Sequence, residues 1–201
     1  MSEIALSMFD LEELSDVSIK SEDSTIFLEG TLNGYSKCPK CNSSHIHRKT
    51  KNSRLFSLPP VGMKQTRLQV NLQKQACVSC KHTWWPNIPF VTGKQRMSHS
   101  FISYALELLK FGTIKDVSIH LGVNWNTIKG IHKDHLNNLY NKIDLTNVEY
   151  VSIDEFAIAK RHKYMTILLD IKSGRILHAV EGRKIKEIEP ILQELKKKLL
   201  S

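Results

Sequence analysis

Two Cys-x-x-Cys pairs constrain this chain more than any other feature. Cys38-Pro-Lys-Cys41 and Cys77-Val-Ser-Cys80 together hold all four cysteines among the 201 residues. The two-residue spacing lets both thiolates of a tight turn face one ion, and two such turns complete a tetrahedral site. The sequence therefore predicts one structural zinc ion, held by Cys38, Cys41, Cys77 and Cys80.

The segment around these pairs, residues 37–92, is predicted to be a zinc ribbon. The 35 residues between the pairs exceed a simple finger loop and suffice for two or three short strands. Two alternatives are a pair of disulfides and a redox dithiol. Disulfides need an oxidising compartment, and the N-terminal residues lack the basic and apolar regions of a secretion signal. A histidine can also replace a cysteine as ligand, and three lie nearby: His45, His47 and His82.

Charge divides the chain into three parts. Residues 1–36 carry a net charge of −7, residues 37–149 carry +12 and residues 150–201 carry +4. Twelve Lys and Arg, but no Asp or Glu, lie between Glu29 and Glu107. A zinc ion with four thiolates carries a formal charge of −2, which accounts for only part of this excess. The remainder indicates a polyanionic partner, DNA or RNA, because a surface that only confers solubility mixes both signs.

The acidic residues 1–36 are predicted to be a lead-in to the ribbon without chemistry of its own. Short strands are expected near residues 17–19 and 25–28. A partly disordered arm and a packed element are both compatible with this composition.

Residues 97–140 have helical periodicity interrupted at short turns. Ser98 and Thr113 are predicted N-caps of two successive helices. Gly122 supplies the positive φ of a tight turn, and Asn124 caps a longer third helix. A short helix, a tight turn and a longer helix are typical of a helix-turn-helix motif. A plain three-helix bundle gives the same pattern, but the basic charge favours DNA binding.

The third helix carries the predicted base contacts. In a helix-turn-helix its N-terminal residues lie in the major groove, where Asn124, Asn126 and Thr127 can hydrogen-bond bases. Three lysines are better placed to contact phosphates: Lys115, Lys129 and Lys133. One face of the third helix is expected to turn inward, with the following residues: Trp125, Ile128, Ile131, His135 and Leu139.

A predicted linker at residues 141–148 precedes a segment of different character. Strands are expected at 150–158, 163–171 and 176–180, followed by a helix over 184–200. Pro190 is tolerated near a helix start, so the first turn is expected around Glu187.

Asp154 lies in the first of these strands, which we expect to be central in its sheet. A carboxylate there is costly unless it is paired or binds a metal. In two-metal nucleases, carboxylates from separate segments hold two Mg²⁺ ions, and Asp154 fits the first of them. An acid at a strand end, paired with Arg161 or Lys163, is the alternative. Asp170 is interpreted as a turn residue and Glu155 as a surface residue.

The order of these features resembles the ISL3 group of bacterial insertion-sequence transposases, which are DDE transposases with an N-terminal zinc ribbon. The similarity covers roughly residues 30–201. Its most specific part is the segment I-D-E-F-A, followed by K-Y, L-L-D, S-G-R and E-G-R. The resemblance implies that an RNase H-like catalytic domain begins at Tyr150, with Asp154 as its first catalytic acid. It also implies zinc ligands at the four cysteines and Mg²⁺-dependent cleavage and strand transfer at transposon ends.

The chain departs from the family pattern because the second and third acids have no match before Ser201. We therefore expect an α+β multidomain fragment: a zinc ribbon, a helix-turn-helix and an incomplete RNase H-like β-β-β-α segment at 150–201. Such a chain is expected to bind the terminal inverted repeats of the element as double-stranded DNA and to be inactive in cleavage alone. A stand-alone DNA-binding regulator derived from a transposase is the alternative function. The resemblance implies a bacterial cytoplasmic, nucleoid-associated location with no membrane contact, and leaves homo-oligomerisation open.

Overall fold

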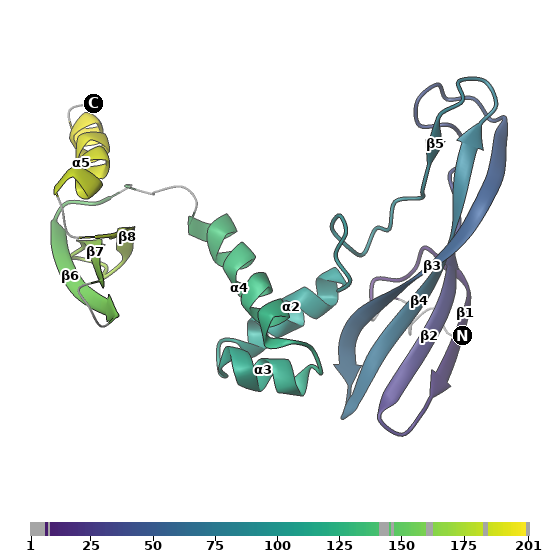
Figure 1. Ribbon diagram of the computed structural model, residues 1–201, viewed down its shortest axis with the longest axis horizontal. Coiled ribbons are helices and arrows are strands. Elements are labelled where there is room, and N and C mark those ends of the chain that lie inside the picture. Colours follow the sequence, from purple (N-terminus) through teal and green to yellow (C-terminus); the bar gives the residue numbers. More distant parts are fainter. Residues whose placement is uncertain are drawn as a thin grey trace. The chain divides into compact units, whose positions relative to one another are not determined.

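The computed structural model is a mixed α+β fold of two compact units, Met1–Asp134 and His135–Ser201 (Figure 1). The structure describes residues 7, 9–140, 145, 147–159, 163–182 and 185–199. Most of the predicted linker at 141–148, and also Arg161, lie outside the described residues.

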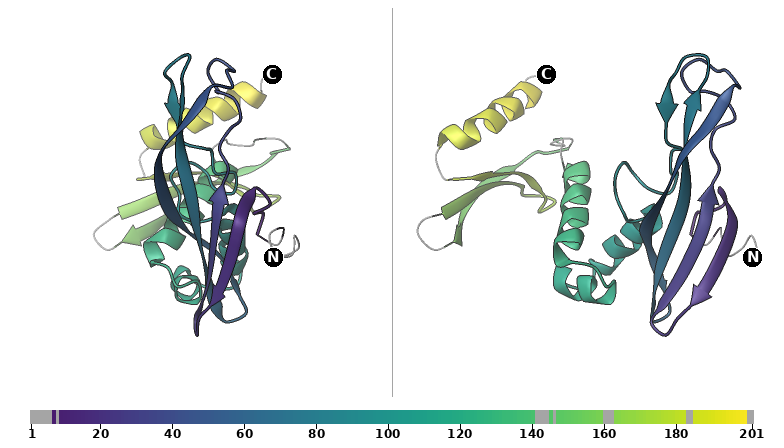
Figure 2. Two further views of the ribbon diagram at one scale, coloured as in Figure 1. Left: turned by 90° about the vertical axis from the view of Figure 1, so that its right-hand side faces the viewer. Right: turned by 45° about the vertical axis from the view of Figure 1, so that its right-hand side comes forward.

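The first unit contains a five-stranded sheet. Its strands are β1 (Leu14–Ser21), β2 (Thr25–Leu32), β3 (Ile46–Val61), β4 (Lys64–Cys77) and β5 (Thr83–Trp84). The order is β1-β2-β4-β3, and β5 pairs with the end of β4. β3 and β4 form a long antiparallel hairpin, whereas β2 runs parallel to β4 (Figure 2). The ribbon is thus built on two long strands, not on the two or three short ones that we expected.

The acidic lead-in belongs to this same sheet. β1 pairs with β2, and β2 pairs with β4 with Leu28 opposite Leu68. The side chains of Leu28 and Leu32 are buried, as are those of Leu11 and Leu14 before and at the start of β1. The sheet therefore continues across the boundary predicted between residues 36 and 37, because burial of these leucines requires the neighbouring strands.

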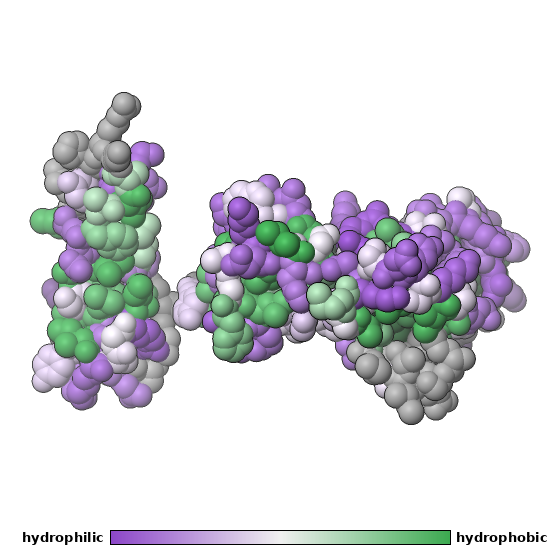
Figure 3. Space-filling model, turned by 90° about the horizontal axis from the view of Figure 1, so that it is seen from below, coloured by the Kyte–Doolittle hydropathy of each residue, from purple (hydrophilic) through white to green (hydrophobic). Residues whose placement is uncertain are grey.

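The two faces of the sheet differ in character because alternate residues of a strand point to opposite sides. One face, with the segments beside it, forms a core of leucines, valines and aromatic residues: Leu11, Leu14, Leu28, Leu32, Phe56, Leu58, Leu68, Val70, Leu72, Ile88, Phe90 and Val91. On β4 the positions between the core residues hold amides and one cation: Gln65, Arg67, Gln69, Asn71, Gln73 and Gln75. We call these six positions the polar row of β4. On the face that Figure 3 shows, hydrophilic residues cover much of the first unit, with hydrophobic patches between them.

Gln75 is the one member of the polar row that is buried, and its amide joins three parts of the chain. Its Oε1 accepts hydrogen bonds from the Tyr35 backbone N–H (2.8 Å) and from Trp84 Nε1 (3.1 Å). Its Nε2 donates to the Tyr35 carbonyl at 2.9 Å. A Cβ on Gly34 would lie 2.4 Å from the Gln75 side chain, so only glycine allows this close approach.

Three helices follow the sheet in the sequence: α2 (His99–Leu108), α3 (Ile114–His120) and α4 (Trp125–Tyr140). The predicted caps of the first two are confirmed. Ser98 Oγ accepts from the Phe101 N–H at 3.0 Å, and Thr113 forms a reciprocal capping box with Asp116. The box also holds the pKa of Asp116 below its usual value, first through the hydrogen bond with the Thr113 side chain.

The turn between α3 and α4 also follows the prediction. Gly122 has a φ of +60°, and Asn124 Oδ1 accepts from the Asn126 N–H at 2.9 Å. Ser118 is buried in α3, and Ile128 is fully buried in α4. These residues give α3 and α4 the helix-turn-helix arrangement.

The predicted inward face of α4 is wrong at both ends. Ile128 and Ile131 are buried, but Trp125 is 48 % exposed and Leu139 is 56 % exposed. At about 100° per residue, Trp125 lies about 90° around the helix from the midpoint of the two isoleucines. Leu139 lies in the last turns of a 16-residue helix, beyond the reach of a 7-residue α3.

The second unit consists of β6 (Val151–Ala159), β7 (Lys163–Asp170), β8 (Ile176–Glu181) and α5 (Ile185–Leu199). The strands form an antiparallel sheet in the order β6-β7-β8. Among the described residues β6 is therefore an edge strand and β7 the middle one, which corrects the prediction that Asp154 lies in a central strand. The cause is connectivity, because two consecutive hairpins place the middle strand of the sequence in the middle of the sheet.

Helix α5 covers a small core of the second unit. This core contains Leu145, Leu168, Leu177, Ile188 and Leu195. The helix begins at Ile185, two residues before the expected start, and Pro190 lies inside it. None of the helices within the described ranges is long and apolar enough to cross a membrane.

We predict that Gln75→Ala destabilises the first unit by about 1–3 kcal/mol, because it leaves the buried Trp84 indole N–H and the partly buried backbone groups of Tyr35 without partners. Chemical denaturation followed by tryptophan fluorescence measures this change. Gln69→Ala is the matched control, since Gln69 is exposed on the same row and should change stability by less than about 0.5 kcal/mol. Equal effects of the two substitutions would contradict the role of Gln75.

Candidate functional site

The four cysteines converge at one end of the β3–β4 hairpin. Their Sγ atoms all lie within 4.8 Å of one another. Cys38 Sγ is 3.6 Å from Cys80 Sγ, and Cys41 Sγ is 3.5 Å from Cys77 Sγ. Zinc–sulfur bonds of about 2.3 Å in a tetrahedron separate the sulfurs by about 3.8 Å. All four residues are free thiols, so the cluster can bind a metal such as zinc and is not a pair of disulfides.

The two Cys-x-x-Cys turns have the same construction. The residue after each second cysteine is left-handed, with φ of 59° at Asn42 and 60° at Lys81. The Asn42 N–H donates to the Cys38 carbonyl at 2.9 Å, and the Lys81 N–H donates to the Cys77 carbonyl at 3.1 Å. Each turn therefore curls around its own pair of sulfurs.

The hairpin brings the two turns together across 35 intervening residues. The first turn precedes β3 and the second follows β4, and Ile46 pairs with Cys77 where these strands meet. The Val78 N–H donates to the His45 carbonyl at 3.0 Å, and the hydroxyls of Ser43 and Ser79 are 3.0 Å apart.

Histidine does not take part in the cluster. Within the described residues, the four cysteines are the one group of three or more His, Cys, Asp or Glu donors close enough to share a metal. The His82 ring instead stacks on Trp84, with centroids 5.6 Å apart and an interplanar angle of 14°. The alternative of a histidine ligand thus has no support in this geometry.

The close approach of the four thiols gives Cys41 and Cys77 very different pKa values. The Cys80 backbone N–H is the main cause that lowers the pKa of Cys77 to about 6. The Ser43 backbone N–H lowers the pKa of Cys41, but neighbouring thiols and burial outweigh it and raise this pKa to about 12. One thiolate thus forms readily, and full ionisation of the set requires a cation in its midst.

The second candidate site is the exposed N-terminal part of α4. Asn124, Asn126, Lys129 and Lys133 are exposed on it, and Thr127 is partly exposed. The Asn124 carbonyl oxygen is occupied by the cap, which leaves its NH₂ group for an external partner. Lys115 is exposed on α3. The structure thus leaves all six predicted DNA contacts accessible.

Trp125 is a feature of this surface that the sequence-based prediction placed in the core. Lys129 Nζ lies 5.2 Å from the centroid of the Trp125 ring. A cation over an aromatic face is attracted by the ring quadrupole. The spacing of four residues that brings both side chains to one face could have indicated this pair from the sequence.

The polar row of β4 holds the turn that leads into α4. Gln65 Nε2 donates to the His120 carbonyl at 2.8 Å, and an Arg67 guanidinium nitrogen lies 3.4 Å from the Gly122 carbonyl. These contacts link the sheet to the helix-turn-helix within the first unit. They were not predicted, because they join residues 55 positions apart in the sequence.

The third candidate, Asp154, is an exposed residue of β6. Its Oδ1 accepts a hydrogen bond from the Glu155 N–H at 2.8 Å. In the part of the chain that the structure describes, no group of carboxylates gathers around it and no ion pair joins it to Lys163. One exposed acid without companions does not fit a two-metal Mg²⁺ site.

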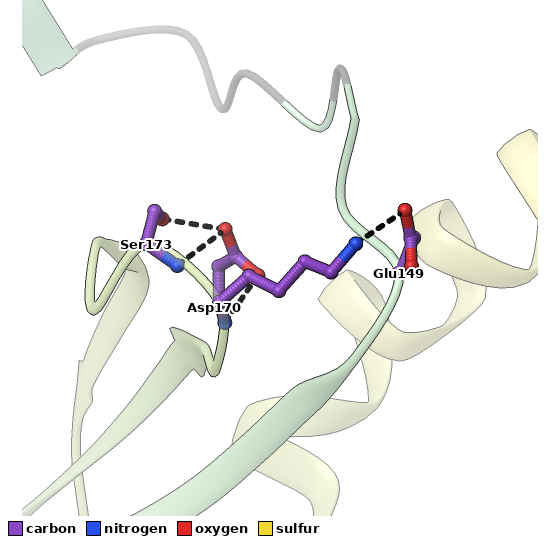
Figure 4. A network of polar contacts seen from close by, with 4 residues as sticks. Glu149, Asp170 and Ser173 are labelled. Atoms are coloured by element: carbon purple, nitrogen blue, oxygen red, sulfur yellow. Dashed lines mark hydrogen bonds and ion pairs between the residues drawn. The ribbon is translucent and has the colours of Figure 1, made fainter.

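Asp170 is a turn residue, as predicted, although it is buried. It accepts hydrogen bonds from the backbone N–H groups of Lys172 (3.2 Å) and Ser173 (3.3 Å), and from the Ser173 hydroxyl (Figure 4). The Ser173 side chain is the main cause that holds the pKa of Asp170 below its usual value. Lys172 Nζ also pairs with Glu149 at 2.7 Å.

Comparisons with known proteins match both units. Residues 86–136 match the model of the helix-turn-helix domain of the ISL3 transposase family, and residues 151–200 match that family's transposase model. The transposase for insertion sequence element IS1001 of Bordetella parapertussis is 23 % identical over 128 residues. The aligned part covers 64 % of this chain and 32 % of that relative. No solved structure matches the chain significantly.

We predict that the full chain contains one zinc ion and that Cys77→Ser removes it. Chelation is expected to release the metal and to unfold the sheet of the first unit, because loss of the ion frees both ends of the hairpin. Metal analysis and far-UV circular dichroism measure the two effects. Lys40→Ala alters an exposed residue of the first turn and should retain the metal. A chain that folds fully without any metal would contradict the prediction.

Proposed function

Because this chain belongs to the ISL3 family of transposases, we propose that it binds the ends of an insertion sequence as the DNA-recognition part of a transposase. The observation that carries the proposal is the helix-turn-helix of α3 and α4. It lies within the matched residues 86–136 and exposes polar and basic side chains along α4.

In this proposal α4 lies in the major groove. Asn126 and Thr127, in its first turn, contact base edges. Asn124 caps the helix and offers its NH₂ group to a neighbouring base. The exposed lysines at positions 115, 129 and 133 contact phosphates on either side of the groove. The stacked Trp125 stiffens Lys129 and presents an apolar surface beside it.

The four cysteines have a structural role in this proposal. Zinc at Cys38, Cys41, Cys77 and Cys80 supplies folding free energy by closing the open end of the β3–β4 hairpin. The same strands hold the turn before α4 through Gln65. The ribbon therefore contributes to recognition by fixing the position of the helix-turn-helix.

We propose that residues 150–201 are the beginning of an RNase H-like catalytic domain with Asp154 as its first acid. The antiparallel β6-β7-β8 sheet followed by α5 has the expected order of elements. Because the described residues gather no group of three metal-binding side chains around Asp154, the chain is expected to bind DNA without cleaving it. A regulator that occupies element ends is the second candidate, favoured by a complete helix-turn-helix beside this single acid.

We predict that the double variant Asn126→Ala/Thr127→Ala loses preference for the element end by at least tenfold. Each good base contact contributes about 1–3 kcal/mol of discrimination. Fluorescence anisotropy with the end duplex and a shuffled duplex measures the ratio of affinities. Asn137→Ala/Asn138→Ala, in the C-terminal half of the same helix, is the matched control. Unchanged sequence preference in the first variant would favour a plain helical bundle.

We further predict no strand cleavage of end DNA by this chain with Mg²⁺ or Mn²⁺. A gel assay with end-labelled duplex measures cleavage. Cleavage that disappears in Asp154→Ala would show a complete active site and overturn the proposed inactivity.

A further inference from the structure

A pocket of about 660 Å³ lies beside the open end of β2, against β3 and β4. Its lining includes Thr31, Asn71 and Gln73 from β2 and β4, and Arg48, Lys51 and Asn52 from β3. We propose that this pocket binds a phosphate of the nucleic-acid backbone, as a second contact outside the helix-turn-helix.

A β-bulge brings the two cations of the pocket together. In a regular strand residues three positions apart point to opposite faces. The register of β3 shifts between Arg48 and Lys51, so that Arg48 lies opposite Gln75 and Lys51 lies opposite Gln73. Gln73 and Gln75 are two residues apart and share a face of β4. Arg48 and Lys51 therefore share that face too, which is the usual consequence of an extra residue in one strand.

The three pocket donors on β3 are not used by the protein itself. Among the described residues, no hydrogen bond or ion pair engages the side chains of Arg48, Lys51 or Asn52. Gln73 makes only a long contact of 3.4 Å with the Lys49 carbonyl. Two cations and amide N–H groups facing one hollow are suited to the oxygens of a phosphodiester.

The charge around the pocket excludes a cationic ligand. No Asp or Glu belongs to the lining that the described residues form. On β2, Glu29 lies two residues before Thr31. Its Oε1 accepts hydrogen bonds from Asn71 (2.9 Å) and Gln69 (3.4 Å), so part of its charge is compensated.

The position of the pocket fits a contact on the same duplex as α4. The polar row of β4 runs from Arg67, which reaches the turn before α4, to Gln73 at the pocket. Six residues of strand span about 20 Å. A turn of B-DNA is about 34 Å long, so a backbone phosphate within one turn of the recognition helix can reach the pocket. The choice of DNA as the polyanion rests on the proposed function, whereas the preference for an anion rests on the pocket alone.

The test compares Arg48→Gln/Lys51→Gln with the wild-type chain in its zinc-bound form. Anisotropy with the end duplex and with a shuffled duplex is measured between 0.05 and 0.3 M salt, on the order of the range in which phosphate contacts dominate. Loss of this phosphate contact should lower the salt slope by about 0.9 and weaken binding by roughly 8-fold near 0.1 M salt. The loss should be equal for both duplexes, because phosphates carry no sequence information.

Two further variants control for charge and geometry. Lys94→Gln/Lys186→Gln removes two exposed cations outside the pocket and should keep the slope within a few tenths of the wild-type value. Arg48→Lys/Lys51→Arg retains both charges and should restore most of the affinity. Zinc content and thermal unfolding verify that each variant is folded.

Unchanged affinity and slope in Arg48→Gln/Lys51→Gln would overturn the pocket proposal, even if Asn126→Ala/Thr127→Ala still abolishes sequence preference. Binding of polyglutamate to the same variant distinguishes an acidic protein segment from DNA. If Arg48→Gln/Lys51→Gln lost polyglutamate binding but kept DNA binding, the pocket would bind an acidic segment, and the proposal would also be overturned. Failure of the wild-type chain to bind either duplex would instead refute the proposed function.

Discussion

Closure of the β3–β4 hairpin by four cysteine sulfurs is the constraint on which the first unit depends. The hairpin is long, and its open end would otherwise be held by a few backbone hydrogen bonds beside Ile46 and Cys77. Two turns of the same construction bring four sulfurs to within 4.8 Å at this end. Trp84 packs against the cluster, and the buried Gln75 ties Trp84 to the segment that enters the first turn. A metal at the cluster thus stabilises strands that reach the helix-turn-helix at their other end.

The two faces of strand β4 make different contacts. Leu68, Val70 and Leu72 point into the core. There they pack with leucines of the N-terminal strands, and this burial stabilises the pairing of those strands with the sheet. The intervening amides and Arg67 stay on the open face. Gln65 and Arg67 hold the turn before α4, and Gln73 lines the pocket with Arg48 and Lys51 from β3. One strand therefore connects the cysteine cluster, the proposed phosphate pocket and the turn before α4.

Features with local causes could be predicted from the sequence. The cysteine spacing, the caps at Ser98 and Thr113, and the turn at Gly122 each depend on a few neighbouring residues. Features set by distant partners could not be predicted. The parallel pairing of β2 with β4 and the contact of Gln65 with His120 both join segments far apart in the sequence. The bulge that aligns Arg48 with Lys51 leaves no signal in hydrophobic periodicity, and helical geometry placed Trp125 on the surface.

We expect this chain to recognise a specific DNA end through α4, and a hydroxyl-radical footprint detects such recognition. The probe is a labelled duplex that carries the terminal repeat flanking this reading frame, with the zinc-bound full chain added at increasing concentration. Binding through α4 should protect one defined stretch of the repeat, with a separate backbone contact within about one helical turn of it. Uniform protection along the whole duplex, or no protection at all, would contradict it.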